Sequence, residues 1–191
     1  MTPSQTPTKY SVSVWEVVTI ISGALVLVIL GFSGVVIKFV KNASEPTRVK
    51  AIAERIVEYQ IPGKSKGWFG INIGSGEIAL VGSADVQLLV GKLSVDTQTK
   101  ENDIAEVFSE ILLLNNVTSS RIENKNLCGI TVPVTIEKGE LSLSKQSSPV
   151  PAIRYRAAAI FKDSEQLVIL RTIGKNAEEN VAHVFNSLKC K

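Results

Sequence analysis

The most apolar part of the chain lies near its N-terminus. Residues 17–37 read VVTIISGALVLVILGFSGVVI and include no charged residue. At about 1.5 Å per residue, a helix of this length spans roughly 30 Å, the thickness of the hydrocarbon core of a bilayer. Trp15 and Phe39 stand near its two ends, where aromatic rings favour the headgroup level. The pattern predicts a single transmembrane helix over residues 15–40.

A cleaved signal peptide is the alternative for this segment. Its apolar core is only about 7–15 residues long, follows basic residues and precedes small ones. Here the apolar run is longer, Lys9 alone precedes it among basic side chains, and basic residues follow it. We therefore expect an uncleaved anchor. Because no ionisable residue lies within the run, the sequence argues against an ion or proton pathway through it.

The basic residues that flank the run predict its orientation. Lys38, Lys41, Arg48 and Lys50 follow it, against Lys9 and the α-amine before it. Positive flanks resist translocation, so we expect the N-terminus outside and the C-terminal domain in the cytoplasm. Residues 1–14 are then a short disordered tail. Residues 41–46 are a linker to a soluble domain over residues 47–191.

Three segments of this domain repeat apolar residues at spacings of three and four. Such spacing is typical of an amphipathic helix, and it predicts helices over residues 47–59, over residues 102–114 and after Asn176. The apolar positions are Val49, Ile52 and Ile56, then Ile104, Val107, Phe108, Ile111 and Leu112, then Val181, Val184, Phe185 and Leu188.

Alternating apolar and polar residues predict strands between these helices. Residues 69–73 and 78–81 form one expected hairpin, and residues 153–161 and 166–173 form another. Residues 86–93 and 128–136 are further strands, the second placed at an edge or a bulge because Pro133 has no N–H to donate. Lys138 and Gly139 predict a turn. The element order indicates an α+β fold, an antiparallel sheet with flanking helices (an α/β/α sandwich), preceded by a single transmembrane helix.

Charge and composition narrow the functional classes. The net charge is +3 and aromatic residues make up 6% of the chain. A nucleic-acid-binding protein usually carries a basic stripe with interleaved aromatic residues, so we expect no nucleic-acid partner. Cys128 and Cys190 are the two cysteines, and their distant spacing resembles neither a disulfide framework nor a zinc site. Pairing is open in principle, but we expect two unpaired thiols in a reducing compartment.

Motifs that suggest catalysis or cofactor binding do not hold up in context. Gly63-Lys64-Ser65 resembles the end of a phosphate-binding loop, but the glycine required five residues before Gly63 is Glu58. His183, the single histidine, lies on the predicted last helix opposite its apolar side and has no other ligand or base nearby in sequence. We therefore expect no enzyme activity, no cofactor and no metal.

Two sets of residues are candidates for binding. Trp68, Phe69 and Asn72 belong to the glycine-rich hairpin at residues 67–76, which we treat as a candidate interaction hairpin. The other set is basic and can contact anionic lipid headgroups at the membrane surface, each cation contributing about 1 kcal/mol. Its members are Lys38, Lys41, Arg48, Lys50, Lys64 and Lys66.

The order of elements also resembles a known family. The helix that ends in Tyr59-Gln-Ile-Pro62, the hairpin Gly67-Trp-Phe-Gly70-Ile-Asn-Ile-Gly74 and the C-terminal pattern Val184-Phe185-Asn-Ser-Leu188 are similar to those of domains with the PsbP-like fold. The resemblance covers roughly residues 47–189. It implies a non-catalytic domain that binds partner proteins. The uncleaved anchor and the cytoplasmic side differ from the photosystem subunits of that family and argue against a role in oxygen evolution.

These observations favour a non-catalytic, membrane-anchored interaction domain, an accessory or assembly subunit of a membrane protein complex. Its expected partners are membrane lipid and proteins of that complex, and the sequence does not fix the oligomeric state. The alternative is a membrane-tethered ligand- or lipid-binding sensor module with a pocket near residues 67–76. A hydrolytic enzyme is third, and it requires His183 beside Ser and Asp side chains.

Overall fold

The structure is a computed structural model that describes residues 38–74, 76–94, 112–142, 148–161 and 164–191. The chain divides into two units, Met1–Lys41 and Asn42–Lys191. Within the first, residues 38–41 are described and are helical. No helix among the described residues is long and apolar enough to cross a bilayer. The span expected over residues 15–40 lies almost entirely outside the described residues and stays a prediction.

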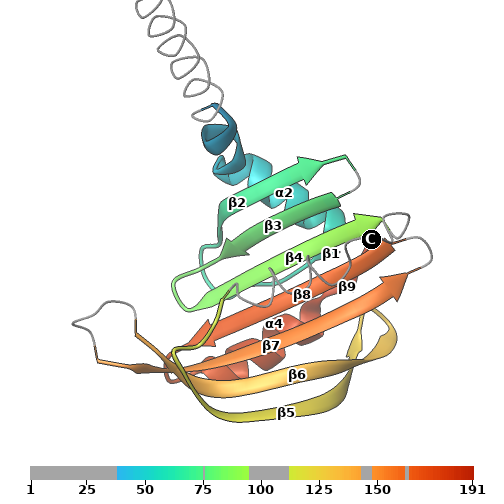
Figure 1. The fold of residues 1–191 in the computed structure, drawn as a ribbon. Coiled ribbons are helices and arrows are strands. Elements are labelled where there is room, and N and C mark those ends of the chain that lie inside the picture. The colour runs from blue at the N-terminus through green and yellow to red at the C-terminus, as the bar shows by residue number, and fades with distance from the viewer. Residues whose placement is uncertain (1–37, 75, 95–111, 143–147, 162–163) are drawn as a thin grey trace, which may run out of the picture. The chain divides into compact units, whose positions relative to one another are not determined.

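A seven-stranded antiparallel sheet dominates the described part of the second unit (Figure 1). Its strand order is β2-β3-β4-β8-β7-β6-β5. The strands are β2 (Lys66–Ile73), β3 (Gly76–Gly82), β4 (Val86–Ser94), β5 (Asn116–Leu127), β6 (Ile130–Leu141), β7 (Val150–Phe161) and β8 (Ser164–Ile173). Two short strands, β1 (Val57–Glu58) and β9 (Lys189–Cys190), pair with each other in a separate small sheet.

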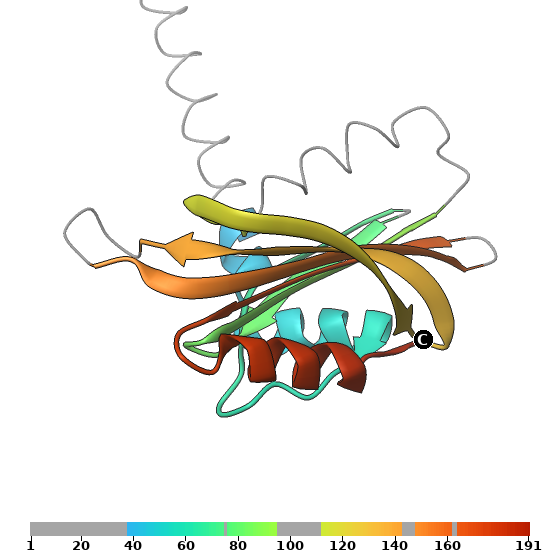
Figure 2. The same ribbon diagram turned by 90° about the horizontal axis from the view of Figure 1, so that it is seen from below.

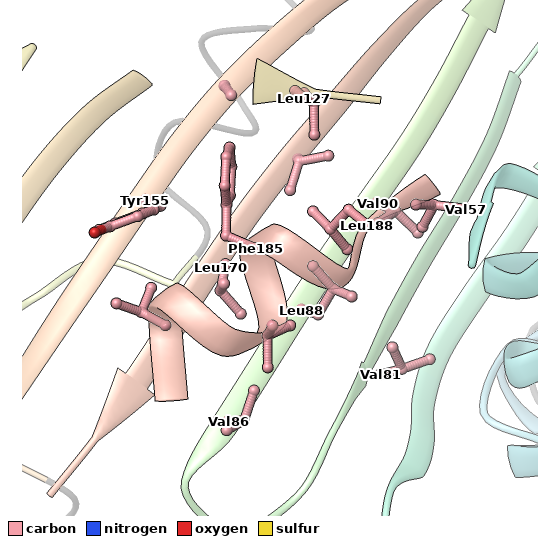
Figure 3. Close-up of a cluster of buried hydrophobic side chains, with 14 of the residues drawn as sticks. Val57, Val81, Val86, Leu88, Val90, Leu127, Tyr155, Leu170, Phe185 and Leu188 are labelled. Atoms are coloured by element: carbon pink, nitrogen blue, oxygen red, sulfur yellow. The ribbon is translucent and has the colours of Figure 1, made fainter. Parts of the chain in front are cut away.

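Helices α2 (Pro46–Ile56) and α4 (Ala177–Ser187) cover the same face of the large sheet, as Figure 2 shows. We call this the helix-side face. Apolar residues of both helices join one buried cluster with alternate residues of the strands. In Figure 3, Phe185 of α4 reaches toward the sheet, and its ring packs edge-on against Tyr155 with centroids 5.5 Å apart. This cluster is the main core of the unit.

Two glycines of β2 allow α2 to lie close against the sheet. A Cβ atom at Gly67 would come within 2.6 Å of the carbonyl oxygen of Pro46, and one at Gly70 within 3.3 Å of the Cα atom of Val49. Any larger residue at Gly67 would therefore push the helix away. The Trp68 ring lies near another glycine, Gly82 of β3.

The predicted α/β/α sandwich is wrong. Most of the described residues are in strands, and α2 and α4 both lie on one face of the sheet, so the described part of the fold is a sheet with a helical layer on one side. The helix expected over residues 102–114 lies outside the described residues up to position 111. Leu112, Leu113 and Leu114 are not helical, and Leu112 has a positive φ of 60°. Leu114 and Leu112 instead join two small apolar clusters, which also hold Ile173 and Ile169.

The strand prediction missed β5 and shortened β6. β5 is an edge strand whose side chains are mostly exposed, so it has no apolar alternation to reveal it. β6 continues to Leu141 through the Lys138-Gly139 pair expected to turn. Pro133 is tolerated in β6, which is not an edge strand, because the pairing of β6 with β7 begins only at Val134. Five other predictions agree with the structure: strand β4, the last helix, the hairpins β2–β3 and β7–β8, and the helix after residue 46. That helix ends at Ile56 rather than at residue 59, because Val57 and Glu58 pair with β9.

A polar row crosses the opposite face of the sheet. Gln87, Arg171, Arg154 and Glu137 stand directly opposite one another on β4, β8, β7 and β6. Arg154 is only 5% exposed and forms an ion pair with Glu137 at 2.6 Å. Arg171 donates to Gln87 Oε1 and, at 2.8 Å, to the carbonyl oxygen of Leu113. Burial, and then the nearby charge of Arg154, lower the pKa of Arg171. We call these four residues the arginine row.

Candidate ligand-binding site

A second polar row crosses the helix-side face near one end of the sheet. Asn72, Glu77, Lys92 and Gln166 stand directly opposite one another on β2, β3, β4 and β8. Each lies two residues from a position that faces α2 or the core, so the strand period of two places all four on the helix-side face. The row therefore brings two amides, one carboxylate and one ammonium group to the same place. We call these four residues the pocket row.

The pocket row lies in a pocket of about 920 Å³, which we call the hairpin pocket. The β2–β3 hairpin, the end of β4 and the β7–β8 hairpin line it, together with Lys191 and the half-cystines Cys128 and Cys190. Phe161 and the disulfide supply apolar surface, and the pocket row with Ser94 and Ser164 supplies polar surface. A pocket of this size is near the upper end of the range that binds small molecules, about 300–1,000 Å³.

Hydrogen bonds hold Glu77 in place. Arg55 of α2 donates to Glu77 Oε1 from Nε at 3.1 Å and from Nη2 at 2.7 Å, and Asn72 Nδ2 donates to the same oxygen at 2.6 Å. Charge-assisted bonds of this kind fix the direction of a carboxylate. Because all three bonds end on Oε1, Oε2 keeps its capacity to accept a hydrogen bond from a ligand.

Gln166 is a buried polar residue whose side chain has an unpaired hydrogen-bond acceptor within the described part of the chain. Its side chain is 2% exposed, and its Nε2 donates to the main-chain oxygen of Lys191 at 3.2 Å. Since that oxygen can only accept, the amide nitrogen must face it and Oε1 must point elsewhere. Among the described residues, Gln166 Oε1 is the one buried side-chain nitrogen or oxygen atom that lacks a hydrogen-bond partner. An acceptor left unpaired in this way costs about 1–3 kcal/mol, and native proteins contain only a few of them.

A disulfide bond between Cys128 and Cys190 forms part of the pocket wall. The expectation of two unpaired thiols is therefore wrong. Cys128 lies in the turn between β5 and β6, where Gly129 N donates to Asn126 Oδ1 at 2.9 Å. Cys190 lies in β9, which is held against β1. Figure 2 shows this end of the β5–β6 hairpin curving toward the C-terminus, so chain curvature that the sequence does not reveal brings the cysteines together.

The candidate interaction hairpin contributes only part of this site. Asn72 lines the hairpin pocket, whereas Trp68 and Phe69 do not, and Phe69 is 40% exposed. The basic residues proposed for lipid contact are outside the pocket. Lys38, Lys41, Arg48, Lys64 and Lys66 are exposed and Lys50 is half-buried. Their role in lipid contact stays a prediction.

Sequence reasoning missed Glu77, Lys92, Gln166 and the disulfide. One feature of the sequence could have pointed to these residues: near the end of each strand, a polar residue takes a position that the alternation assigns to the buried face. Such residues meet only if their strands are neighbours in the sheet. Lys92 of β4 pairs with Gln166 of β8, more than 70 residues away, and the sequence does not show this pairing. His183 is exposed on α4, as expected. No cluster of three or more His, Cys, Asp or Glu residues suited to a metal ion is found within the part of the chain that the structure describes.

Comparison with known proteins does not identify a family or a function for this chain. No family model matches the chain, and no curated protein matches its sequence. One solved structure is similar, that of LpqN, described as involved in cell envelope biogenesis of Mycobacterium tuberculosis. It has a TM-score of 0.40 and 10% sequence identity over 70% of this chain and 82% of LpqN. At this score the likeness carries no function over to this chain. The resemblance to the PsbP-like fold stays a prediction.

Proposed function

We propose that this chain is a membrane-anchored, non-catalytic binding domain and that the hairpin pocket holds its ligand. The buried, unpartnered Gln166 Oε1 is the observation that carries this proposal. A folded domain gains nothing from leaving this acceptor unpaired, whereas a ligand that donates a hydrogen bond removes the cost. The proposal favours the ligand-binding alternative of the sequence analysis, because Asn72, Gly74 and Gly76 of the expected hairpin line the pocket.

The chemistry of the pocket row favours a compound rich in hydroxyl groups, such as a sugar. Gln166 Oε1 and Glu77 Oε2 both require a donor, whereas the Lys92 ammonium group requires an acceptor. A hydroxyl group is donor and acceptor at once and serves all three. A simple anion has nothing to donate to Gln166 and is repelled by Glu77, and a simple cation is repelled by Lys92. The apolar surface of Phe161 suits the C–H face of a sugar ring.

Lys191 controls access to the amide. The main-chain oxygen of Lys191 accepts from Gln166 Nε2 and, at 3.4 Å, from Lys92 Nζ. Gln166 Oε1 is almost fully covered, so we expect the amide to rotate when a ligand enters the pocket. Ligand binding should then be accompanied by a small shift of Lys191, and the resonances of residues 189–191 should report it.

A calorimetric titration of the full-length chain in detergent micelles tests this proposal. We would titrate glucose, N-acetylglucosamine, glucuronate and, as ionic controls, sulfate and tetramethylammonium. We expect heat from at least one sugar and none from the ionic controls. Gln166→Met should abolish the heat, and the matched substitution Gln60→Met, at an exposed position outside the pocket, should leave it unchanged.

Two outcomes would contradict the proposal. One is the absence of binding by all three sugars at millimolar concentration. The other is sugar binding that survives Gln166→Met, because it would place the ligand elsewhere. The role as a subunit of a larger membrane complex, expected from the sequence, stays a prediction.

A further inference from the structure

We infer that the second unit of this chain lies in an oxidising compartment, outside the cytoplasm. Both cysteines of the chain are joined in the Cys128–Cys190 disulfide. Their Cα atoms are 5.2 Å apart, within the range of about 4.4–6.8 Å that a disulfide requires without backbone movement. Structural disulfides persist in oxidising compartments, whereas cytoplasmic thiols are kept reduced.

The two cysteines are brought together by contacts that do not involve sulfur. Cys128 has a φ of 56° and is followed by Gly129 with a φ of 89°, so a tight turn fixes its direction. Cys190 is opposite Val57 in the β1–β9 pair, and the next residue, Lys191, donates from its main-chain N to Ile56 O at 3.1 Å. These main-chain contacts hold both cysteines in position and do not depend on the sulfur atoms. Two thiols held in this way would be oxidised wherever the compartment permits it.

The bond also joins elements that are far apart in the sequence. Cys128 and Cys190 are 62 residues apart in sequence. The disulfide ties the end of the β5–β6 hairpin to the small β1–β9 sheet and so closes one side of the hairpin pocket. A cross-link that closes a long loop mainly restricts the unfolded chain, which is the usual role of disulfides in exported domains.

This inference reverses the orientation expected from the flanking charges. If residues 17–37 cross the membrane, the N-terminus is cytoplasmic and the second unit is outside. The charge rule is a bias that applies best to short loops, because long domains are translocated largely regardless of charge. The excess of basic residues after the apolar run is small, so the disulfide is the stronger indication. The hairpin pocket would then receive its ligand from the non-cytoplasmic side.

Thiol trapping in intact cells tests the compartment. Full-length protein at native expression would be quenched in acid, treated with a maleimide polymer that adds mass at each free thiol, and resolved on a denaturing gel. We expect no added polymer without reductant and two after reduction. The Cys128→Ser chain should gain one polymer under both conditions and thereby calibrates the gel. Two polymers on the native chain without reductant would overturn the inference.

Protease accessibility tests the orientation separately. Protease added to the outside of intact cells without an outer barrier, or of spheroplasts, should remove the second unit, and disruption of the membrane should add no further cleavage. Protection of an oxidised second unit until the membrane is disrupted would mean a disulfide on the cytoplasmic side and would overturn the inference. Neither readout uses a ligand, so failure here is distinguishable from failure of the sugar titration.

Discussion

Two polar rows cross the same sheet on opposite faces, and they differ in how their hydrogen bonds are met. In the arginine row, Arg154 is paired with Glu137, and Arg171 is bonded to Gln87 and to the main chain of Leu113. In the pocket row, Glu77 is held by Arg55, but Gln166 Oε1 has no partner among the described residues. A buried polar group is expensive only when it is left unpaired. The comparison therefore supports a structural role for the arginine row and is consistent with the proposed ligand binding at the pocket row.

Removal of Glu137 tests the structural role of the arginine row and should have the largest effect. Glu137→Ala leaves the buried guanidinium of Arg154 without its carboxylate, so the free energy of unfolding should fall by about 3–5 kcal/mol in urea titrations. Glu178→Ala removes a comparable ion pair with Lys138 that is largely exposed, and it should leave the unfolding midpoint unchanged. Equal effects of the two substitutions would mean that burial of the row contributes nothing.

Loss of the disulfide should affect the pocket more than the arginine row. Replacement of Cys128 and Cys190 together by Ser should lower the free energy of unfolding by about 2–4 kcal/mol. Amide hydrogen exchange should accelerate most in β1, β9 and the β5–β6 turn. The amides of Arg154 and Arg171 should exchange only as fast as the lower free energy of global unfolding predicts. Uniform acceleration across the sheet would show that the disulfide does not act locally.

The same substitution made in both rows is the sharpest comparison. Gln87→Met removes the acceptor of two Arg171 hydrogen bonds and should cost about 2 kcal/mol of unfolding free energy. Gln166→Met removes one hydrogen bond to Lys191 together with an unpaired acceptor, so the change should be below about 1 kcal/mol, in either direction. Thermal unfolding of the two variants measures the difference. A larger loss from Gln166→Met would make the pocket row structural.

Alkaline titration should give the smallest effect. Burial, and then the charge of Glu54, raise the pKa of Tyr59 from 10.0 to about 12. The folded state therefore holds a proton that the unfolded state releases above pH 10, so stability should fall as the pH rises from 10 to 12 and then level off. Tyr59→Phe should remove this slope in urea titrations at fixed pH. A slope that persists in the variant would have another origin.

The hydrophobic pattern predicted the parts of the fold that bury a face. Helix α2, helix α4 and the two hairpins β2–β3 and β7–β8 repeat apolar residues with the period of their element, which is why they were found. β5 exposes most of its side chains and left no such trace. The pocket row was not predicted from the sequence for a different reason. Gln166 begins a predicted strand and looks like an ordinary surface residue, and only the pairing of β4 with β8 places it opposite Lys92 beneath Lys191.

The polar edge strand β5 has a consequence for the association of one copy of this chain with another. A bare strand edge invites one sheet to extend into the next. Along β5, Arg121, Glu123 and Lys125 alternate in charge and form ion pairs with each other at 2.6 and 2.9 Å. A neighbouring copy would have to desolvate these charges to add a strand. The exposed charges of β5 thereby help to prevent the sheets of two molecules from pairing edge to edge.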